Sequence, residues 1–192
     1  MTNFESKFNN AKLKMINGMI EALKYKDILD ISVKELCIIS GVNRTTFYAH
    51  YNNIMELLED TKDYMFQKFM STFKETSFEK IKNGEKNSDL ISEEYLIPYL
   101  KFIKEHRWFY IVIYKHNLFL DKDEPFYQLI ESISKPISRA KGSLDEVAVI
   151  YSTRFFVDGI NSVVREWIKR GFKESEEYIC KIILSASSKG RI

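Results

Sequence analysis

Two helix-start signals and one helix-stop signal fall close together near the N-terminus of the chain. Ser32 is a favourable N-cap, and Glu35 three residues later completes a capping box. Gly41 stands where a helix ends in a left-handed residue, and Asn43 then caps a second helix. Two short helices joined by a glycine-containing turn predict a helix-turn-helix unit. The two predicted helices span residues 33–40 and 44–51.

Apolar residues recur at helical spacing through most of the remaining chain. In residues 6–25, for example, Ile16, Ile20 and Leu23 follow one another at helical intervals. The β-like run from Tyr110 to Tyr114 lies between helical flanks. We therefore predict an all-α protein in which a three-helix head precedes a larger C-terminal helical bundle. The further helices expected span residues 6–25, 53–82, 92–105, 106–116, 123–136, 144–170 and 175–187.

Membrane and secreted proteins do not fit the sequence. The longest unbroken apolar run, Trp108 to Tyr114, is far shorter than the roughly 20 residues that a membrane span needs. The first residues hold scattered charges in place of the apolar block of a signal peptide. Cys37 and Cys180 are too few for a disulfide framework, which favours a reducing compartment. We therefore expect a cytoplasmic protein that makes no membrane contact.

The patterns of catalytic and metal sites are also missing from the sequence. His106 and His116 are too far apart to form a metal pair on one helix face. No nucleotide-binding loop, nucleophile elbow or CxxC pair occurs. Asp121, Asp123 and Glu124 fit a loop and a helix start better than a calcium site. We expect no enzyme activity, no catalytic residue, no metal and no cofactor.

A set of residues in register relates the head to a known family. Residues 32–58 read SVKELCIISGVNRTTFYAHYNNIMELL. The matching residues are Ser32, Val33, Leu36, Cys37, Gly41, Val42, Asn43, Arg44, Thr46, Phe47, Tyr48, Tyr51, Glu56, Leu57 and Leu58. This segment resembles the DNA-binding segment of the TetR/AcrR family of bacterial transcriptional regulators. Residues further on resemble regulators related to the dihydroxyacetone-kinase operon activator, namely Phe156, Gly159, Trp167, Gly171, Ser175, Glu176 and Glu177.

The resemblance implies both an organisation and a function. It implies a helix-turn-helix DNA-binding domain in residues 1–52 and an effector-binding and dimerisation domain in residues 53–192. It further implies a homodimer on a palindromic double-stranded DNA operator, acting as a repressor that a small-molecule effector releases. An activator or co-regulator stays open, as does a small-molecule-binding or protein-interaction module that no longer reads DNA.

The second short helix presents polar side chains where a recognition helix meets the major groove. Arg44 can pair with guanine O6 and N7, and Thr45 and Thr46 can bond to base edges or touch a thymine methyl. Phe47 and Tyr51 are expected in the core. The start of the first short helix offers amides and positive charge to a phosphate. The candidate DNA-binding residues are Ser32, Lys34, Asn43, Arg44, Thr45, Thr46, Tyr48 and His50.

The head carries little net charge for a DNA-binding unit. Residues 1–60 contain seven Lys or Arg and eight Asp or Glu, and the whole chain has a net charge of +2. Ile54 stands where the family usually has lysine, so we expect a phosphate contact to be lost there, and Asn52 and Asn53 offer neutral hydrogen bonds instead. DNA binding must therefore depend on where the charges are placed, with weak non-specific affinity and a shallow salt dependence.

Aromatic side chains are dense between residues 95 and 130. They can simply fill a core, but several are tyrosines, whose hydroxyls need partners when buried. Aromatic walls with a few polar groups also describe a small-molecule pocket between helices, where the family binds its inducers. The candidate effector residues are Tyr64, Tyr99, Phe102, Tyr114, Tyr127, Phe155 and Asn161.

The predicted helix over residues 144–170 is apolar on more than one side. A helix of this kind is buried on both sides, one against its own core and the other against a partner. Together with the last helix it predicts a twofold dimer built as a four-helix bundle, the alternative being a monomer with a large core. The candidate interface residues are Val149, Phe156, Ile160, Val163, Trp167, Ile179 and Ile183.

Overall fold

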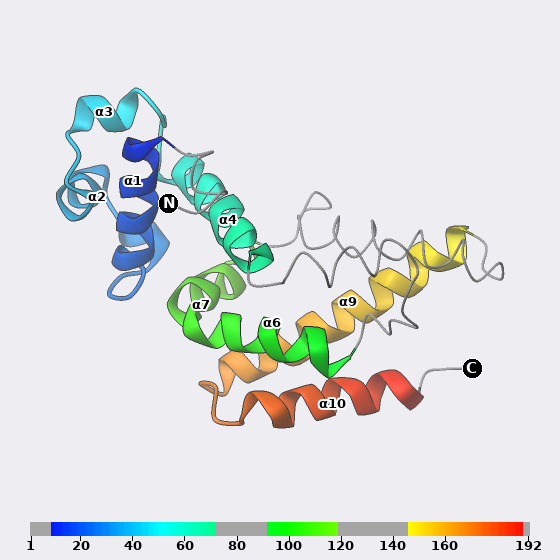
Figure 1. Cartoon of the computed structure of the whole chain (residues 1–192). Coiled ribbons are helices and arrows are strands. Elements are labelled where there is room, and N and C mark those ends of the chain that lie inside the picture. The colour runs from blue at the N-terminus through cyan, green and yellow to red at the C-terminus, as the bar shows by residue number, and fades with distance from the viewer. Residues whose placement is uncertain (1–8, 72–91, 119–145, 190–192) are drawn as a thin grey trace. The chain divides into compact units, whose positions relative to one another are not determined.

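The structure, a computed structural model, describes residues 9–71, 92–118 and 146–189 (Figure 1). Within these residues every regular element is a helix, which confirms the predicted all-α class. The helix predicted over residues 123–136 lies outside them, as does the end of the helix predicted over residues 53–82. None of the described helices is long and apolar enough to cross a membrane.

The chain divides into two compact units, each described here by itself. The described residues of the first unit are 9–71 and 108–116, and those of the second are 92–107, 117–118 and 146–189. The first unit contains α1 (Asn10–Ala22), the 3-10 helix η2 (Ile28–Asp30), α2 (Val33–Ser40), α3 (Arg44–Tyr48), α4 (Ile54–Met70) and nearly all of α7 (Arg107–Lys115). The second contains α6 (Glu93–Glu105), α9 (Glu146–Lys169) and α10 (Glu176–Lys189).

The ends of α2 and α3 follow the local signals in the sequence. The Ser32 hydroxyl accepts the Glu35 N–H at 3.2 Å, and the Glu35 carboxylate accepts the Ser32 N–H at 3.2 Å. Gly41 ends α2 with φ of 65°, a conformation that costs glycine little. The Asn43 side chain accepts the Thr46 N–H at 2.7 Å and so caps α3. The predicted helix-turn-helix unit is therefore present.

The helices of the head pack around α1, which contacts both α2 and α4, while α2 contacts α3 (Figure 1). Gly18 of α1 allows the closest approach, because a Cβ added there would lie 2.7 Å from Ser40 Cβ on α2. The fully buried side chains of this core include Met15, Ile16, Met19, Leu36, Phe47, Leu57 and Leu58.

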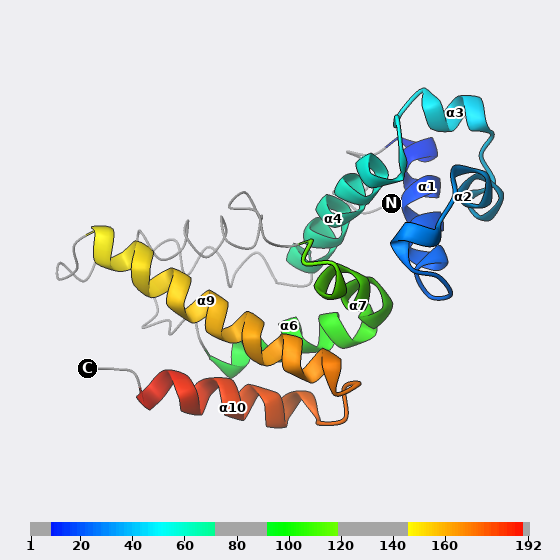
Figure 2. The same cartoon turned by 180° about the vertical axis from the view of Figure 1, so that it is seen from behind.

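In the second unit α10 packs against both α6 and α9 (Figure 2). The Lys104 ammonium on α6 forms an ion pair with Glu176 on α10 at 2.9 Å and lies 5.8 Å from the ring centre of Trp167 on α9. Gly171 has φ of 72° just after α9, where the sequence predicted that helix to end. The buried core residues include Leu100, Phe102, Ile103, Val157, Val164, Trp167, Ile179, Cys180 and Ile183.

Candidate nucleic-acid interface

The recognition helix α3 is held by one aromatic face and leaves its polar face open. Phe47 is fully buried, and its ring meets Tyr51 at 5.9 Å between centroids. Tyr48 packs edge-on against Phe47 and is still 57% exposed. Arg44 and Thr45 at the start of the helix are exposed. A helix fixed through its apolar face with polar residues outward has the form of a major-groove reader.

The other predicted DNA contacts occupy the loops and helix start next to α3. Asn43 is exposed and uses its side chain as the N-cap of α3. Ser32 and Lys34 are exposed at the start of α2, although the Ser32 hydroxyl also donates to Glu35 at 2.9 Å. The candidates that are half-buried are Thr46 and His50.

Charge in the head is distributed unevenly between paired and unpaired cations. Lys12 pairs with Asp60, Lys24 pairs with Glu21 and Lys26 pairs with Glu35, all within the head. Within the described residues, the two basic candidates for DNA contact, Lys34 and Arg44, form no ion pair and are exposed. The acids of the head thus neutralise other lysines, and the near-zero net charge does not screen the two candidate cations.

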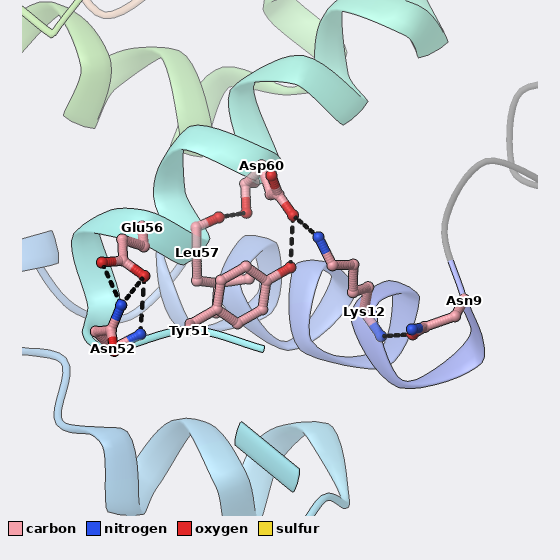
Figure 3. Close-up of polar contacts among 8 residues, drawn as sticks. Asn9, Lys12, Tyr51, Asn52, Glu56, Leu57 and Asp60 are labelled. Carbon is pink, nitrogen blue, oxygen red and sulfur yellow. Dashed lines mark hydrogen bonds and ion pairs between the residues drawn. The ribbon is translucent and has the colours of Figure 1, made fainter. Parts of the chain in front are cut away.

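A polar network behind α3 joins three helical segments, as Figure 3 shows. The Tyr51 hydroxyl donates to Asp60 Oδ2 at 2.8 Å, and Lys12 Nζ donates to the same oxygen at 2.6 Å. Burial raises the pKa of the Tyr51 hydroxyl, and the Asp60 carboxylate raises it further, so this group stays protonated as a donor. The network ties the end of α3 to α4 and α1. Sequence reasoning placed Tyr51 in the core but missed this role, because the partners are far apart along the chain.

The loop that leads into α4 is closed by an acid. The Glu56 carboxylate accepts the Asn52 side-chain amide at 2.9 and 3.0 Å and the Asn52 backbone N–H at 2.8 Å (Figure 3). Asn53 caps α4 by accepting the Glu56 N–H at 3.0 Å. The Asn52 amide, expected to replace the lysine missing at Ile54, therefore already serves Glu56.

The candidate effector residues are divided between the two units. Tyr99 and Phe102 on α6 are buried, and the Tyr99 hydroxyl lies 3.5 Å from Asn161 Oδ1 on α9, so these three residues meet in the second unit. Phe155 on α9 is 71% exposed. The others are buried Tyr64 and half-buried Tyr114, which belong to the first unit, and Tyr127, which lies outside the described residues.

Most of the candidate interface residues pack within the second unit itself. Ile160, Trp167, Ile179 and Ile183 are buried there, whereas Phe156 and Val163 are half-buried and the Val149 side chain is not described. The exposed apolar side chains of α9 and α10 are Val147, Tyr151, Phe155, Tyr178 and Ile182.

We expect the head to lose stability in acid through Glu35. The Lys26 ammonium and then the Ser32 N–H and hydroxyl lower the pKa of this carboxyl from its usual 4.5 to about 2. Its contribution to stability is therefore complete above pH 4.5 and is lost as the pH falls towards 2. Glu35→Gln cannot titrate but can still cap α2. Thermal unfolding at pH 5 and pH 3 should show a smaller fall in Tm for the variant than for the wild type, and equal falls would contradict the assignment.

Comparison with known proteins follows from this geometry. A TetR-type family model described as "Transcriptional regulator C-terminal region" matches residues 91–189. Among solved structures, the chain is similar to "Dihydroxyacetone kinase operon activator DhaS", at 20% sequence identity and a TM-score of 0.56. That likeness covers 92% of this chain and 93% of the other. None of the curated proteins compared with the chain matches it.

Proposed function

The chain belongs to the TetR family of transcriptional regulators, and from this premise we propose that it binds an operator as a homodimer and is released by a small molecule. The observation that carries the DNA-binding proposal is the pair of exposed cations, Lys34 and Arg44, beside a capped recognition helix. Arg44 and Thr45 would read base edges, and Lys34 with the start of α2 would hold a phosphate. The two heads of the dimer would meet half-sites about 34 Å apart or a multiple of it.

The effector proposal is supported by the second unit. Tyr99 and Asn161 place a polar pair beside the buried ring of Phe102, which is the chemistry of a pocket for a mostly apolar molecule with one or two polar groups. Such a molecule would shift the population between two states of the dimer that differ in DNA affinity.

An activator is the second candidate, because the similar solved structure is named an operon activator. A reporter gene placed behind the upstream DNA separates the two directions of regulation. Expression that rises when the regulator is deleted identifies a repressor, and expression that falls identifies an activator.

Fluorescence anisotropy with labelled DNA from upstream of the regulator's own gene tests the DNA-binding proposal. We expect saturable binding that weakens with salt, because counterions are released as phosphates are neutralised. Competition with unrelated DNA of equal length provides the control. Equal affinity for both DNAs would favour a module that no longer reads sequence.

We expect the dimer to depend on exposed residues of α9. Tyr151 and Phe155 are 72% and 71% exposed, so Phe155→Glu removes an interface contact without touching the core of the unit. In sedimentation, the wild type should have twice the chain mass of 22.7 kDa, and the variant should have the single mass. Tyr25→Glu changes an equally exposed aromatic residue of the head and should leave the dimer intact. A wild-type mass of 22.7 kDa would contradict the proposal.

A further inference from the structure

The carboxylate of Asp27 receives donors from two distant stretches of the chain. Its Oδ2 accepts Lys115 Nζ at 2.5 Å, and its Oδ1 lies 2.7 Å from His116 Nε2. The same Oδ1 accepts the Leu29 N–H at 3.2 Å, which makes Asp27 the N-cap of η2. The Asp27 side chain is only 18% exposed. An ordinary surface ion pair has one partner and contributes little, whereas this carboxylate has three and is largely shielded from water.

The two sides of this cluster have different places in the chain. On one side, Asp27 opens η2, and η2 leads directly to Ser32 at the start of α2, where we propose a phosphate contact. On the other side, Lys115 and His116 stand at the C-terminal end of α7, where positive charge is favourable. The Asp27 cluster thus links the end of α7 to the start of α2.

Helix α7 belongs to the head by packing although it lies in the C-terminal region by sequence. Residues 108–116 are part of the first compact unit, and Phe109 and Ile113 are buried. Residues 92–107, immediately before them, are part of the second unit, and α6 is separated from α7 by His106 alone. A change in α6 therefore has a short covalent path to a helix that is packed with the head.

We propose that Asp27 couples α7 to the start of α2, so that displacement of α7 by an event in the second unit lowers the DNA affinity of the head. This inference rests on the proposed DNA-binding function. With the Asp27 cluster closed, η2 and the start of α2 are held in the DNA-competent position. With it open, Asp27 retains its cap of η2 but loses both cations of α7. The two arrangements differ in contacts at both ends, as coupling between sites requires.

Matched variants separate this coupling from general effects of charge. Asp27→Asn keeps a side chain that can cap η2 and removes the charge that holds Lys115. Lys115→Met removes the cation from the other side. Glu21→Gln and Lys24→Met make the same charge changes in an ion pair that lies at the end of α1 and does not involve α7. All four variants are made in the full chain.

Hydrogen–deuterium exchange of the free protein tests the coupling without DNA. We expect Lys115→Met to accelerate exchange in residues 28–36, although the substitution lies in α7. Asp27→Asn should accelerate exchange in residues 107–116. The Glu21 and Lys24 variants should change neither segment. Unchanged exchange of residues 28–36 in Lys115→Met, relative to Lys24→Met, would overturn the proposal.

Binding of the upstream DNA tests the consequence for function. We expect Asp27→Asn and Lys115→Met each to weaken binding about 5-fold or more, and the double variant to bind no more weakly than the weaker single variant. Additive effects would show that the two residues act independently and would overturn the coupling. If the wild type binds no DNA, the DNA-binding proposal fails, and the exchange experiment still decides whether α7 and the start of α2 are coupled.

Discussion

Replacing Arg44 with alanine should weaken binding of the upstream DNA by about 5- to 150-fold, the equivalent of ~1–3 kcal/mol for a bidentate contact with guanine. Arg44 is the first residue of α3 and is exposed, so its removal leaves the buried face of the helix unchanged. It forms no ion pair among the described residues, so no acid loses its partner. Thermal unfolding of the variant should therefore match that of the wild type. The loss should appear in DNA affinity alone.

The control is a second cation of the head that faces an acid. Lys24→Ala removes the same charge from the exposed pair with Glu21 and should leave DNA affinity nearly unchanged. Lys34→Ala makes a further distinction, because a phosphate contact should weaken binding to all sequences alike and reduce the salt slope by about 1. Wild-type affinity in Arg44→Ala would exclude α3 as the reader of the operator.

The ends of α2 and α3 could be predicted residue by residue because local interactions set them. Ser32 and Glu35 satisfy each other's backbone groups, and Asn43 satisfies that of Thr46, all within three residues. The end of α1 was harder. It was expected near Tyr25 but comes at Ala22, because the N–H groups of the following residues bond three residues back and tighten the chain into a turn.

The long-range polar contacts of the head could not be predicted. Asp60 is separated from Lys12 by 48 positions, and Asp27 from Lys115 by 88, so no spacing rule connects them. The sequence analysis used the balance of charges in the head and could not tell which acids were already paired. The structure supplies that pairing, and the exposed cations Lys34 and Arg44 are what remains.

Apolar periodicity likewise did not distinguish a helix face that meets its own chain from one that meets a partner. Trp167 and Ile183 were candidates for the interface and are buried within the second unit, whereas Tyr151 was not a candidate and is exposed. Both kinds of face carry the same residue types, because a dimer interface of this class has the composition of a core. The exposed pair Ile38 and Ile39 on α2 has no explanation in the structure.

The second large effect is expected from a single methyl group in the head. A Cβ at Gly18 would lie 2.7 Å from Ser40 Cβ and 3.2 Å from Ser40 Cα, so α1 and α2 would have to separate. Overpacking of this kind costs about 1–3 kcal/mol. Alanine recovers up to about 1 kcal/mol through its higher helix propensity. Because the nearest atoms include backbone that cannot rotate away, we expect the cost to prevail, and Gly18→Ala to lower the free energy of unfolding in urea.

Two controls identify the contact responsible. Asn17→Ala improves propensity at an exposed position of the same helix and should leave stability unchanged or slightly higher. Ser40→Gly removes the atom nearest to the added methyl, so Gly18→Ala should cost less in that background than in the wild type. An equal cost in both backgrounds would show that the strain lies elsewhere. Since α2 contacts α3, a wider spacing between α1 and α2 would also displace the recognition helix, and DNA affinity should fall together with stability.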